Sequence, residues 1–171
     1  MKVLFIQPPW SDIYGKYKPA AKVGNCYPPL GICYLSSVLK KSGHTTKIID
    51  AEIEGKTFND ILSVIEDFKP TLIAFTSTTP LFSSARTMAE NIKESVDIPI
   101  VIGGPHVSVM SDSIITSDGP FDFAIYGEGE RSILELVNVL NGSEKGLNEI
   151  EGLIFKDASG KAIKNAVANY I

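Results

Sequence analysis

Five short runs rich in β-branched and other apolar residues constrain the fold of this chain most strongly. They cover residues 2–6, 46–50, 72–75, 98–102 and 123–126, each separated from the next by a segment long enough for a helix. Short apolar runs of this kind are typical of strands buried on both faces of a sheet. Strands that alternate with helices form parallel sheets. The sequence therefore predicts an α/β fold, a doubly wound, flavodoxin-like (Rossmann-like) five-stranded parallel sheet with helices on both faces.

The segments between the runs predict helices over residues 29–43, 57–68, 83–96 and 132–140, and a weakly amphipathic stretch covers 107–117. Thr57 is the expected N-cap of the second helix. The first helix is expected to turn an apolar stripe toward the core, with Cys33 close to it. That stripe consists of Leu30, Tyr34, Leu35, Val38 and Leu39.

The C-terminal part has a different pattern. Residues 152–156 and 161–163 read as two strands joined by a glycine-containing turn, which predicts a small β-hairpin. The chain is therefore divided at residue 145. Residues 1–145 form the α/β domain, and 146–171 form the hairpin and the start of a linker.

Composition narrows the class of protein. The 171 residues include 44% hydrophobic residues, enough for one domain with a sizeable core. A net charge of −4 and scattered lysines argue against a nucleic-acid partner. The apolar runs are far shorter than the roughly 20 residues of a membrane span, and Pro8 follows the first run too soon for a signal peptide. We expect a cytoplasmic chain with no nucleic-acid and no membrane partner.

Unusual loops follow four of the predicted strands. They are Gln7-Pro8-Pro9, the hydroxyl-rich stretch Thr76-Ser77-Thr78-Thr79-Pro80, Gly103-Gly104-Pro105-His106 and Gly127-Glu128-Gly129-Glu130. Ligands of doubly wound sheets bind outside the carboxyl ends of the strands, where these loops would meet. The sequence therefore predicts a binding site at this edge of the sheet.

Some of these features also have a purely structural interpretation, besides a role in a binding site. The pair Gly103-Gly104 also suits a plain strand-to-helix turn, and Glu128 and Glu130 are also explained by favourable interaction with a helix dipole. The long segment after Trp10 has aromatic residues that either cover a flat ligand or pack the loop onto its own domain. Those residues are Tyr14, Tyr17 and Tyr27.

Several motifs, taken in this order, resemble the amino-terminal cobalamin-binding domain of the cobalamin-dependent radical S-adenosylmethionine enzymes. They are Gln7-Pro8-Pro9, Pro28-Pro29-Leu30-Gly31-Ile32 with Tyr34-Leu35 and Gly43-His44, Ile49-Asp50-Ala51, Gly103-Gly104-Pro105-His106 and Gly127-Glu128-Gly129-Glu130. The resemblance covers nearly the whole chain. It implies a corrin ring over the carboxyl ends of the strands, and a nucleotide tail in a groove lined by the 76–79 loop and the two glycines at 103 and 104.

The resemblance also implies a set of cofactor-binding residues. They are Pro8, Pro9, Thr76, Ser77, Thr78, Thr79, Gly103, Gly104, Pro105, His106, Gly127, Glu128 and Gly129. Many cobalamin-binding domains carry a D-x-H-x-x-G motif whose histidine ligates cobalt, but the corresponding stretch here, residues 11–15, has no histidine. We therefore expect base-off cobalamin with no histidine ligand. His106 is expected to hydrogen-bond a neighbouring loop or the cofactor instead.

The cysteines set a further limit. Radical enzymes of this class hold a 4Fe-4S cluster with three cysteines, whereas this chain has only Cys26 and Cys33, which we interpret as reduced thiols. The sequence shows no catalytic triad, metal-binding cluster or P-loop. The chain is therefore expected to have no catalytic residues and no metal site of its own. The cluster and S-adenosylmethionine would belong to a radical SAM domain of methyltransferase or cyclase type following residue 171.

The leading hypothesis is thus a cobalamin-binding (corrinoid) module that presents cobalt to a downstream catalytic domain, for methyl transfer. One alternative is a flavodoxin-like domain that binds a nucleotide or nucleotide-sugar, with the threonine-rich loop and the glycine pair around phosphate. Another is a scaffold that has lost the cofactor.

Overall fold

The structure, a computed structural model, describes residues 1–10 and 28–167. In chain order the elements are β1 (Lys2–Gln7), α2 (Leu30–Lys41), β2 (Thr45–Asp50), α3 (Phe58–Phe68), β3 (Leu72–Thr76), η2 (Thr79–Leu81), α4 (Phe82–Ser95), β4 (Ile100–Gly103), α5 (Pro105–Ile114), β5 (Phe123–Ile125), α6 (Glu130–Leu140), η3 (Leu147–Glu149), β6 (Leu153–Lys156) and β7 (Ala162–Lys164). The predicted alternation of strands and helices is confirmed.

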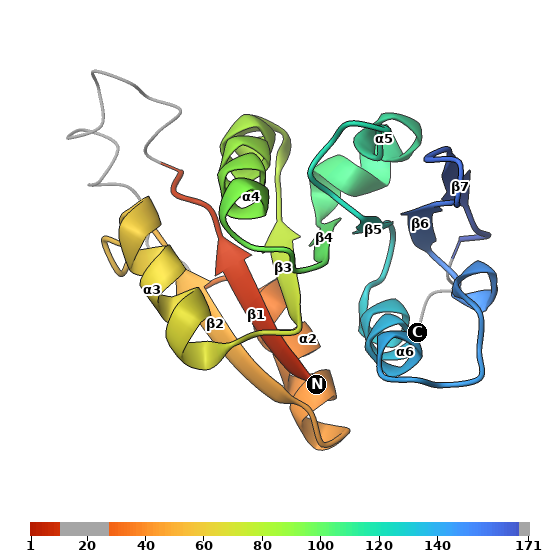
Figure 1. Ribbon diagram of the computed structural model, residues 1–171, viewed down its shortest axis with the longest axis horizontal. Coiled ribbons are helices and arrows are strands. Elements are labelled where there is room, and N and C mark those ends of the chain that lie inside the picture. The colour runs from red at the N-terminus through yellow and green to blue at the C-terminus, as the bar shows by residue number, and fades with distance from the viewer. Residues whose placement is uncertain (11–27, 168–171) are drawn as a thin grey trace.

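All strands within the described residues belong to one sheet with the order β2-β1-β3-β4-β5-β6-β7. The first five strands pair in parallel, in the predicted flavodoxin-like order. The C-terminal hairpin then continues the sheet, since β6 pairs antiparallel with β5 and β7 pairs antiparallel with β6. Figure 1 shows this succession of strands, with β6 and β7 beyond β5 at one end of the molecule.

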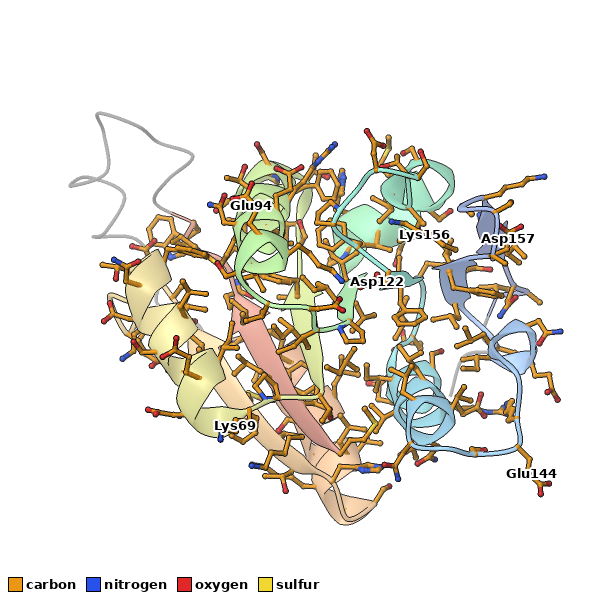
Figure 2. All side chains as sticks on the ribbon, in the orientation of Figure 1. Lys69, Glu94, Asp122, Glu144, Lys156 and Asp157 are labelled. Carbon is orange, nitrogen blue, oxygen red and sulfur yellow. The ribbon has the colours of Figure 1, made fainter. Side chains whose placement is uncertain are left out.

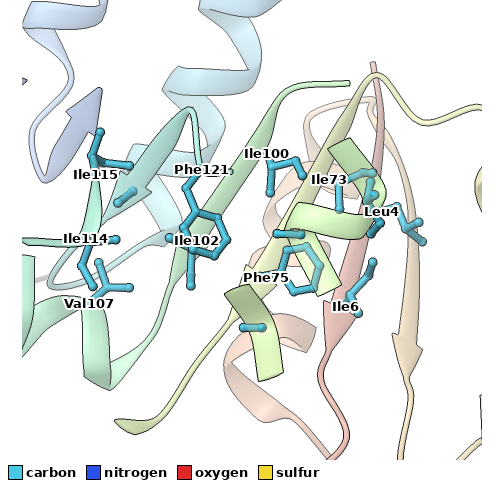
Figure 3. Packing of buried hydrophobic residues seen from close by; sticks show 14 of the residues in the cluster. Leu4, Ile6, Ile73, Phe75, Ile100, Ile102, Val107, Ile114, Ile115 and Phe121 are labelled. Carbon is cyan, nitrogen blue, oxygen red and sulfur yellow. The ribbon is translucent and has the colours of Figure 1, made fainter. Parts of the chain in front are cut away.

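The sheet separates two apolar cores, because alternate residues of each central strand point to opposite faces. In β1, Leu4 and Ile6 pack with residues of α3, α4 and α5. Figure 3 shows part of this core, where Ile73, Phe75 and Phe121 lie among aliphatic side chains. On the other face, Val3 and Phe5 pack with residues of α2 and α6. Both faces of the sheet are therefore covered by helices, as predicted.

Helix α2 corrects part of the sequence prediction. Leu30 and Tyr34 are 62% and 64% exposed, and Cys33 is exposed, so their predicted place at or near the core was wrong. The buried residues of α2 are Ile32, Ser36 and Leu39, of which only Leu39 belongs to the predicted stripe. Ser36 obscured this face in the sequence because it is polar. Its hydroxyl lies 2.6 Å from the Thr46 hydroxyl in a hydrogen bond, which makes its burial acceptable.

The start of α3 confirms the predicted cap. The Thr57 hydroxyl accepts a hydrogen bond from the Asp60 backbone N–H, and the Asp60 side chain accepts one from the Thr57 N–H. These two bonds make a capping box. Two hydrogen bonds from Thr57 lower the pKa of the Asp60 carboxyl. The bond from the Thr57 side chain has the larger effect, and the bond from the Thr57 backbone N–H has the smaller one.

Polar contacts join the sheet to its helices and loops. Asp122, just before β5, accepts a hydrogen bond from the Ile100 N–H and pairs with Lys93 of α4, with 2.7 Å between the charged atoms. Lys156 of β6 donates to the Gly119 carbonyl at 2.9 Å. Both Asp122 and Lys156 are labelled in Figure 2.

In the part of the chain that is described, no helix has the length and apolar character needed to cross a membrane.

Candidate functional site

A cavity of about 360 Å³ lies at the edge of the sheet where the parallel strands end. It is bounded by the ends of β3, β4 and β5 and by the first turns of α2, α5 and α6. The lining residues are Phe5, Gly31, Ile32, Leu35, Ala74, Phe75, Thr76, Val101, Gly103, Gly104, Pro105, Ile125, Gly127, Glu128, Gly129, Glu130 and Ile133. The cavity is therefore at the edge that the sequence predicted.

The inner part of the cavity is apolar. Phe5, Ala74 and Val101 are buried residues of the core between the sheet and helices α2 and α6. Ile125 and Ile133 extend the same surface. Such a surface suits an apolar or aromatic part of a ligand, while polar groups are confined to the rim.

The cavity brings together part of the predicted site. Of the predicted site residues, those that line the cavity are Thr76, Gly103, Gly104, Pro105, Gly127, Glu128 and Gly129. They come from the ends of three strands that are far apart in the sequence. Their role in holding a ligand stays a prediction.

Other predicted residues lie beside the cavity or support its loops. Pro8 and Ser77 are buried, whereas Thr78 is exposed, and none of them lines the cavity. Ser77 joins two loops, since its N–H donates to the Gly103 carbonyl at 2.9 Å and its carbonyl accepts from the His106 N–H at 3.1 Å. Pro9 and Thr79 are also absent from the lining.

His106 is held by the loop after β3. Its Nδ1 atom lies 3.1 Å from the Thr79 hydroxyl in a hydrogen bond, and its ring lies against the Phe82 ring with centroids 4.3 Å apart. The side chain is buried and does not line the cavity. The predicted hydrogen bond to a neighbouring loop is thus present.

Gly104 is required by the backbone at this point. Its φ of 103° is in a region that residues with side chains rarely adopt. A Cβ at this position would lie 2.7 Å from the Ser77 carbonyl oxygen and 2.8 Å from the Thr76 hydroxyl. The close approach of two loops therefore explains this glycine without any ligand.

The two acidic residues after β5, Glu128 and Glu130, differ in their exposure to solvent. Glu128 is exposed, whereas Glu130 begins α6 and is partly buried. The Oε2 atom of Glu130 is buried and has no hydrogen-bond partner among the described residues. A carboxylate at a helix N-terminus is electrostatically favourable. A buried oxygen without a hydrogen-bond donor is nevertheless unusual in a native protein.

Sequence reasoning missed the contribution of α2 to the site. Gly31, Ile32 and Leu35 line the cavity, but an apolar helix gives no sign of which of its residues border an open space. The predicted aromatic cover, Tyr14, Tyr17 and Tyr27, lies outside the described residues, as does Cys26. Among the residues that are described, no group of three or more histidine, cysteine or acidic side chains is arranged to hold a metal ion.

Fold and cavity together define a doubly wound α/β domain with a binding site at the carboxyl ends of its strands. Comparison with protein families then identifies the class, since residues 18–137 match the model of the B12 binding domain. This match spans most of the chain. The chain belongs to the B12-binding domain family, and the nucleotide-binding alternative is not favoured.

Individual relatives agree with this assignment. The chain is 36% identical over 160 residues to an uncharacterized methyltransferase, PH0819, of Pyrococcus horikoshii, covering 92% of this chain and 33% of that protein. It is 27% identical over 167 residues to the anaerobic magnesium-protoporphyrin IX monomethyl ester cyclase of Rubrivivax gelatinosus, covering 95% of this chain and 29% of the cyclase. The chain thus spans about a third of the length of these relatives.

Solved structures show the same fold. The cobalamin-dependent S-adenosylmethionine radical enzyme OxsB, with aqua-cobalamin and S-adenosylmethionine bound, superposes with a TM-score of 0.80 at 19% identity. The match covers 99% of this chain and 22% of OxsB. At this level of identity the similarity establishes the fold.

Proposed function

We propose that the chain binds cobalamin in this cavity and presents its cobalt to a downstream catalytic domain for methyl transfer. The observation that carries the proposal is a cavity at the carboxyl ends of the strands in a chain of the B12-binding family. When bound, cobalamin would supply a cobalt atom able to carry a methyl group, which no amino-acid side chain can do.

The residues of the cavity fit the nucleotide tail of this cofactor. The apolar depth formed by Phe5, Ala74 and Val101 suits the flat base of the tail. The N-termini of α2 and α5 border the cavity, where partial positive charge favours the phosphate of the tail, whereas the N-terminus of α6 is occupied by the carboxylate of Glu130. We assign Thr76, Gly103 and the 127–129 loop to this rim.

We further propose that cobalamin binds base-off and without a histidine ligand. The hydrogen bond of His106 to Thr79 and its contact with Phe82 support the absence of a histidine ligand, because they hold the ring away from the cavity lining. The role of the chain's own residues would then be to hold the displaced tail.

We infer that the catalytic part of the protein is a covalently linked radical SAM domain, of methyltransferase or cyclase type, containing the 4Fe-4S cluster and binding S-adenosylmethionine. The names of the longer relatives and of OxsB support this inference. The division into a cobalamin-binding domain at 1–145 and a hairpin with a linker at 146–171 belongs to the same proposal, as does a cytoplasmic location.

The test is a titration of the purified chain with hydroxocobalamin, followed by visible absorption. We expect saturable binding and a base-off spectrum, unchanged in a His106→Ala variant apart from a modest loss of affinity. A nitrogen-ligated spectrum that the variant loses would reject the absence of a histidine ligand. An unchanged spectrum would reject the base-off state, and the absence of any heat of binding in a calorimetric titration would reject cobalamin binding by this chain.

A further inference from the structure

The chain after β7 runs back to the carboxyl end of β5. Residues 164–167, here called the strap, begin with the last residue of β7 and continue directly after it. Asn165 is partly buried, and the other three residues of the strap are exposed. None of these four residues lines the cavity. Their contacts nevertheless reach the elements that support the loop after β5, residues 127–129, which does line the cavity.

Tyr126 holds two residues of the strap. It is buried and lies directly before the loop after β5. Its hydroxyl donates a hydrogen bond to the Asn165 carbonyl. The ammonium group of Lys164 lies 5.0 Å from the centroid of the Tyr126 ring, within the range of a cation–π interaction. Lys164 also donates to the hydroxyl of Ser111 in α5 at 2.6 Å. The strap is thus fixed both to the end of β5 and to α5.

A second set of hydrogen bonds fixes the strap to the start of the hairpin. The side-chain amide of Asn165 donates to the carbonyls of the first residue of η3 and of the residue after η3, at 2.7 and 2.8 Å. The Ala166 carbonyl accepts from the Gly152 N–H at 2.7 Å. The Gly152 carbonyl in turn accepts from the Tyr126 N–H at 3.0 Å. Backbone and side-chain bonds of the strap therefore lead to the same tyrosine.

The strap also lies beside the loop after β5. A Cβ at Gly127 would lie 3.8 Å from the Cγ2 atom of Val167, so Val167 is a direct neighbour of this glycine. The Gly127 N–H donates to the Ser108 hydroxyl of α5 at 3.0 Å. The strap and the loop after β5 therefore share two supports, Tyr126 and α5.

The position of the strap makes it a unit that can open while the sheet stays folded. Its side chains are mostly exposed, and segments with few buried apolar contacts open at a lower free energy than the core does. Opening would remove the acceptor of the Tyr126 hydroxyl and the neighbour of Gly127, so the loop after β5 would lose order with the strap. A ligand that binds the ordered loop would therefore favour the state in which the strap is docked.

We propose that the strap couples occupancy of the cavity to the part of the protein that follows the strap. Cobalamin in the cavity stabilises the docked strap, and the docked strap strengthens cobalamin binding by the same factor. This inference rests on the proposed function. The strap would hold the start of the following radical SAM domain beside the loop after β5 when the cofactor is bound, and less firmly when the cavity is empty.

The test compares the 171-residue chain with Tyr126→Phe and Asn165→Ala, which remove the hydroxyl bond and the side-chain bonds of the strap. Hydrogen–deuterium exchange is followed in peptides containing residues 127–130 and 164–167, with and without hydroxocobalamin, and the affinity is measured by calorimetry. Asp157→Ala is the control for hairpin stability. The Asp157 carboxylate, labelled in Figure 2, accepts three hydrogen bonds within the turn between β6 and β7, at the opposite end of the hairpin from the strap.

In the wild type, hydroxocobalamin should slow exchange in the strap as well as in the loop after β5, by about fivefold or more. Tyr126→Phe and Asn165→Ala should each lower cobalamin affinity by about fivefold. Both variants should also speed exchange of residues 127–130 in the absence of cofactor. Asp157→Ala should lower the midpoint of thermal unfolding but leave cobalamin affinity and the exchange of residues 127–130 unchanged.

Three results would overturn the coupling while leaving the proposed function intact. The first is bound hydroxocobalamin that protects the loop after β5 but not the strap. The second is wild-type affinity in both strap variants. The third is an equal loss of affinity in Asp157→Ala, which would reduce the effect to hairpin stability. If the wild-type chain binds no cobalamin, the proposed function itself is wrong and the coupling is rejected with it.

Discussion

At the scale of single residues, two neighbouring glycines at the cavity differ in whether the fold requires them. Gly104 combines φ of 103° with ψ of 179°, a region that is almost restricted to glycine. It also lies against the backbone of Ser77. Gly103, its neighbour in sequence, has room for a Cβ, whose nearest atom would be the Ile125 carbonyl oxygen at 3.6 Å. A pair that looks uniform in the sequence therefore has two different roles.

Replacing Gly104 with alanine should lower the free energy of unfolding by about 1–3 kcal/mol from backbone strain alone. The contact with the Ser77 carbonyl, at 2.7 Å from a Cβ, adds to this loss. Urea unfolding of Gly104→Ala measures it, and Gly103→Ala is the matched control with an expected change well below that of Gly104→Ala. Equal stability of the two variants would contradict our reading of the loop contact.

Side-chain packing explains why only part of the site could be predicted from the sequence. The hydroxyl-rich loop after β3 and the glycine-containing loops after β4 and β5 could be placed at one edge, because strand order follows from the alternation of strands and helices. The lining contributed by α2 could not, because it depends on rotation of the helix about its axis. That rotation is fixed by Ser36, whose burial next to Thr46 no hydrophobic pattern predicts. Glu130 belonged to the motif that carries the resemblance, but it was not among the predicted cofactor-binding residues, although it lines the cavity.

At the scale of elements, a side-chain cap stabilises the start of helix α3, whereas α2, α4, α5 and α6 have no side-chain hydrogen bond at their N-caps. In α3, Thr57 and Asp60 satisfy two backbone N–H groups. The pKa of Asp60 is lower in the folded state than its ordinary value of 3.8. The charged carboxylate of Asp60 therefore stabilises the folded state at pH values above 3.8. That contribution is lost as the pH falls through the lower, folded-state pKa.

Replacing Thr57 with alanine should therefore lower the free energy of unfolding by about 1 kcal/mol at neutral pH. The difference from the wild type should shrink as the pH falls below 3.8, the ordinary pKa of the Asp60 carboxyl. Denaturant unfolding at several pH values measures both. Thr87→Ala, at an exposed position inside α4, is the control and should be neutral or slightly stabilising. A difference between wild type and Thr57→Ala that does not change with pH would exclude the part assigned to Asp60.

At the scale of the whole molecule, seven strands form one sheet, and the hairpin β6–β7 covers what would otherwise be the exposed edge of β5. Ile150, Leu153 and Phe155 join the core shared by α2 and α6. That core also forms the inner wall of the cavity. The elements after residue 145 therefore help to support the site, although they contribute no lining residue.

The central claim is that cobalamin occupies the cavity at the carboxyl ends of the strands. Hydrogen–deuterium exchange of the chain, with and without hydroxocobalamin, tests it most directly. Protection is predicted at the 76–79, 103–106 and 127–130 loops and at the first turn of α2, with no change in α3, which lies on the other face of the sheet and does not line the cavity. Protection confined to other surfaces, or none at saturating cofactor, would contradict the account.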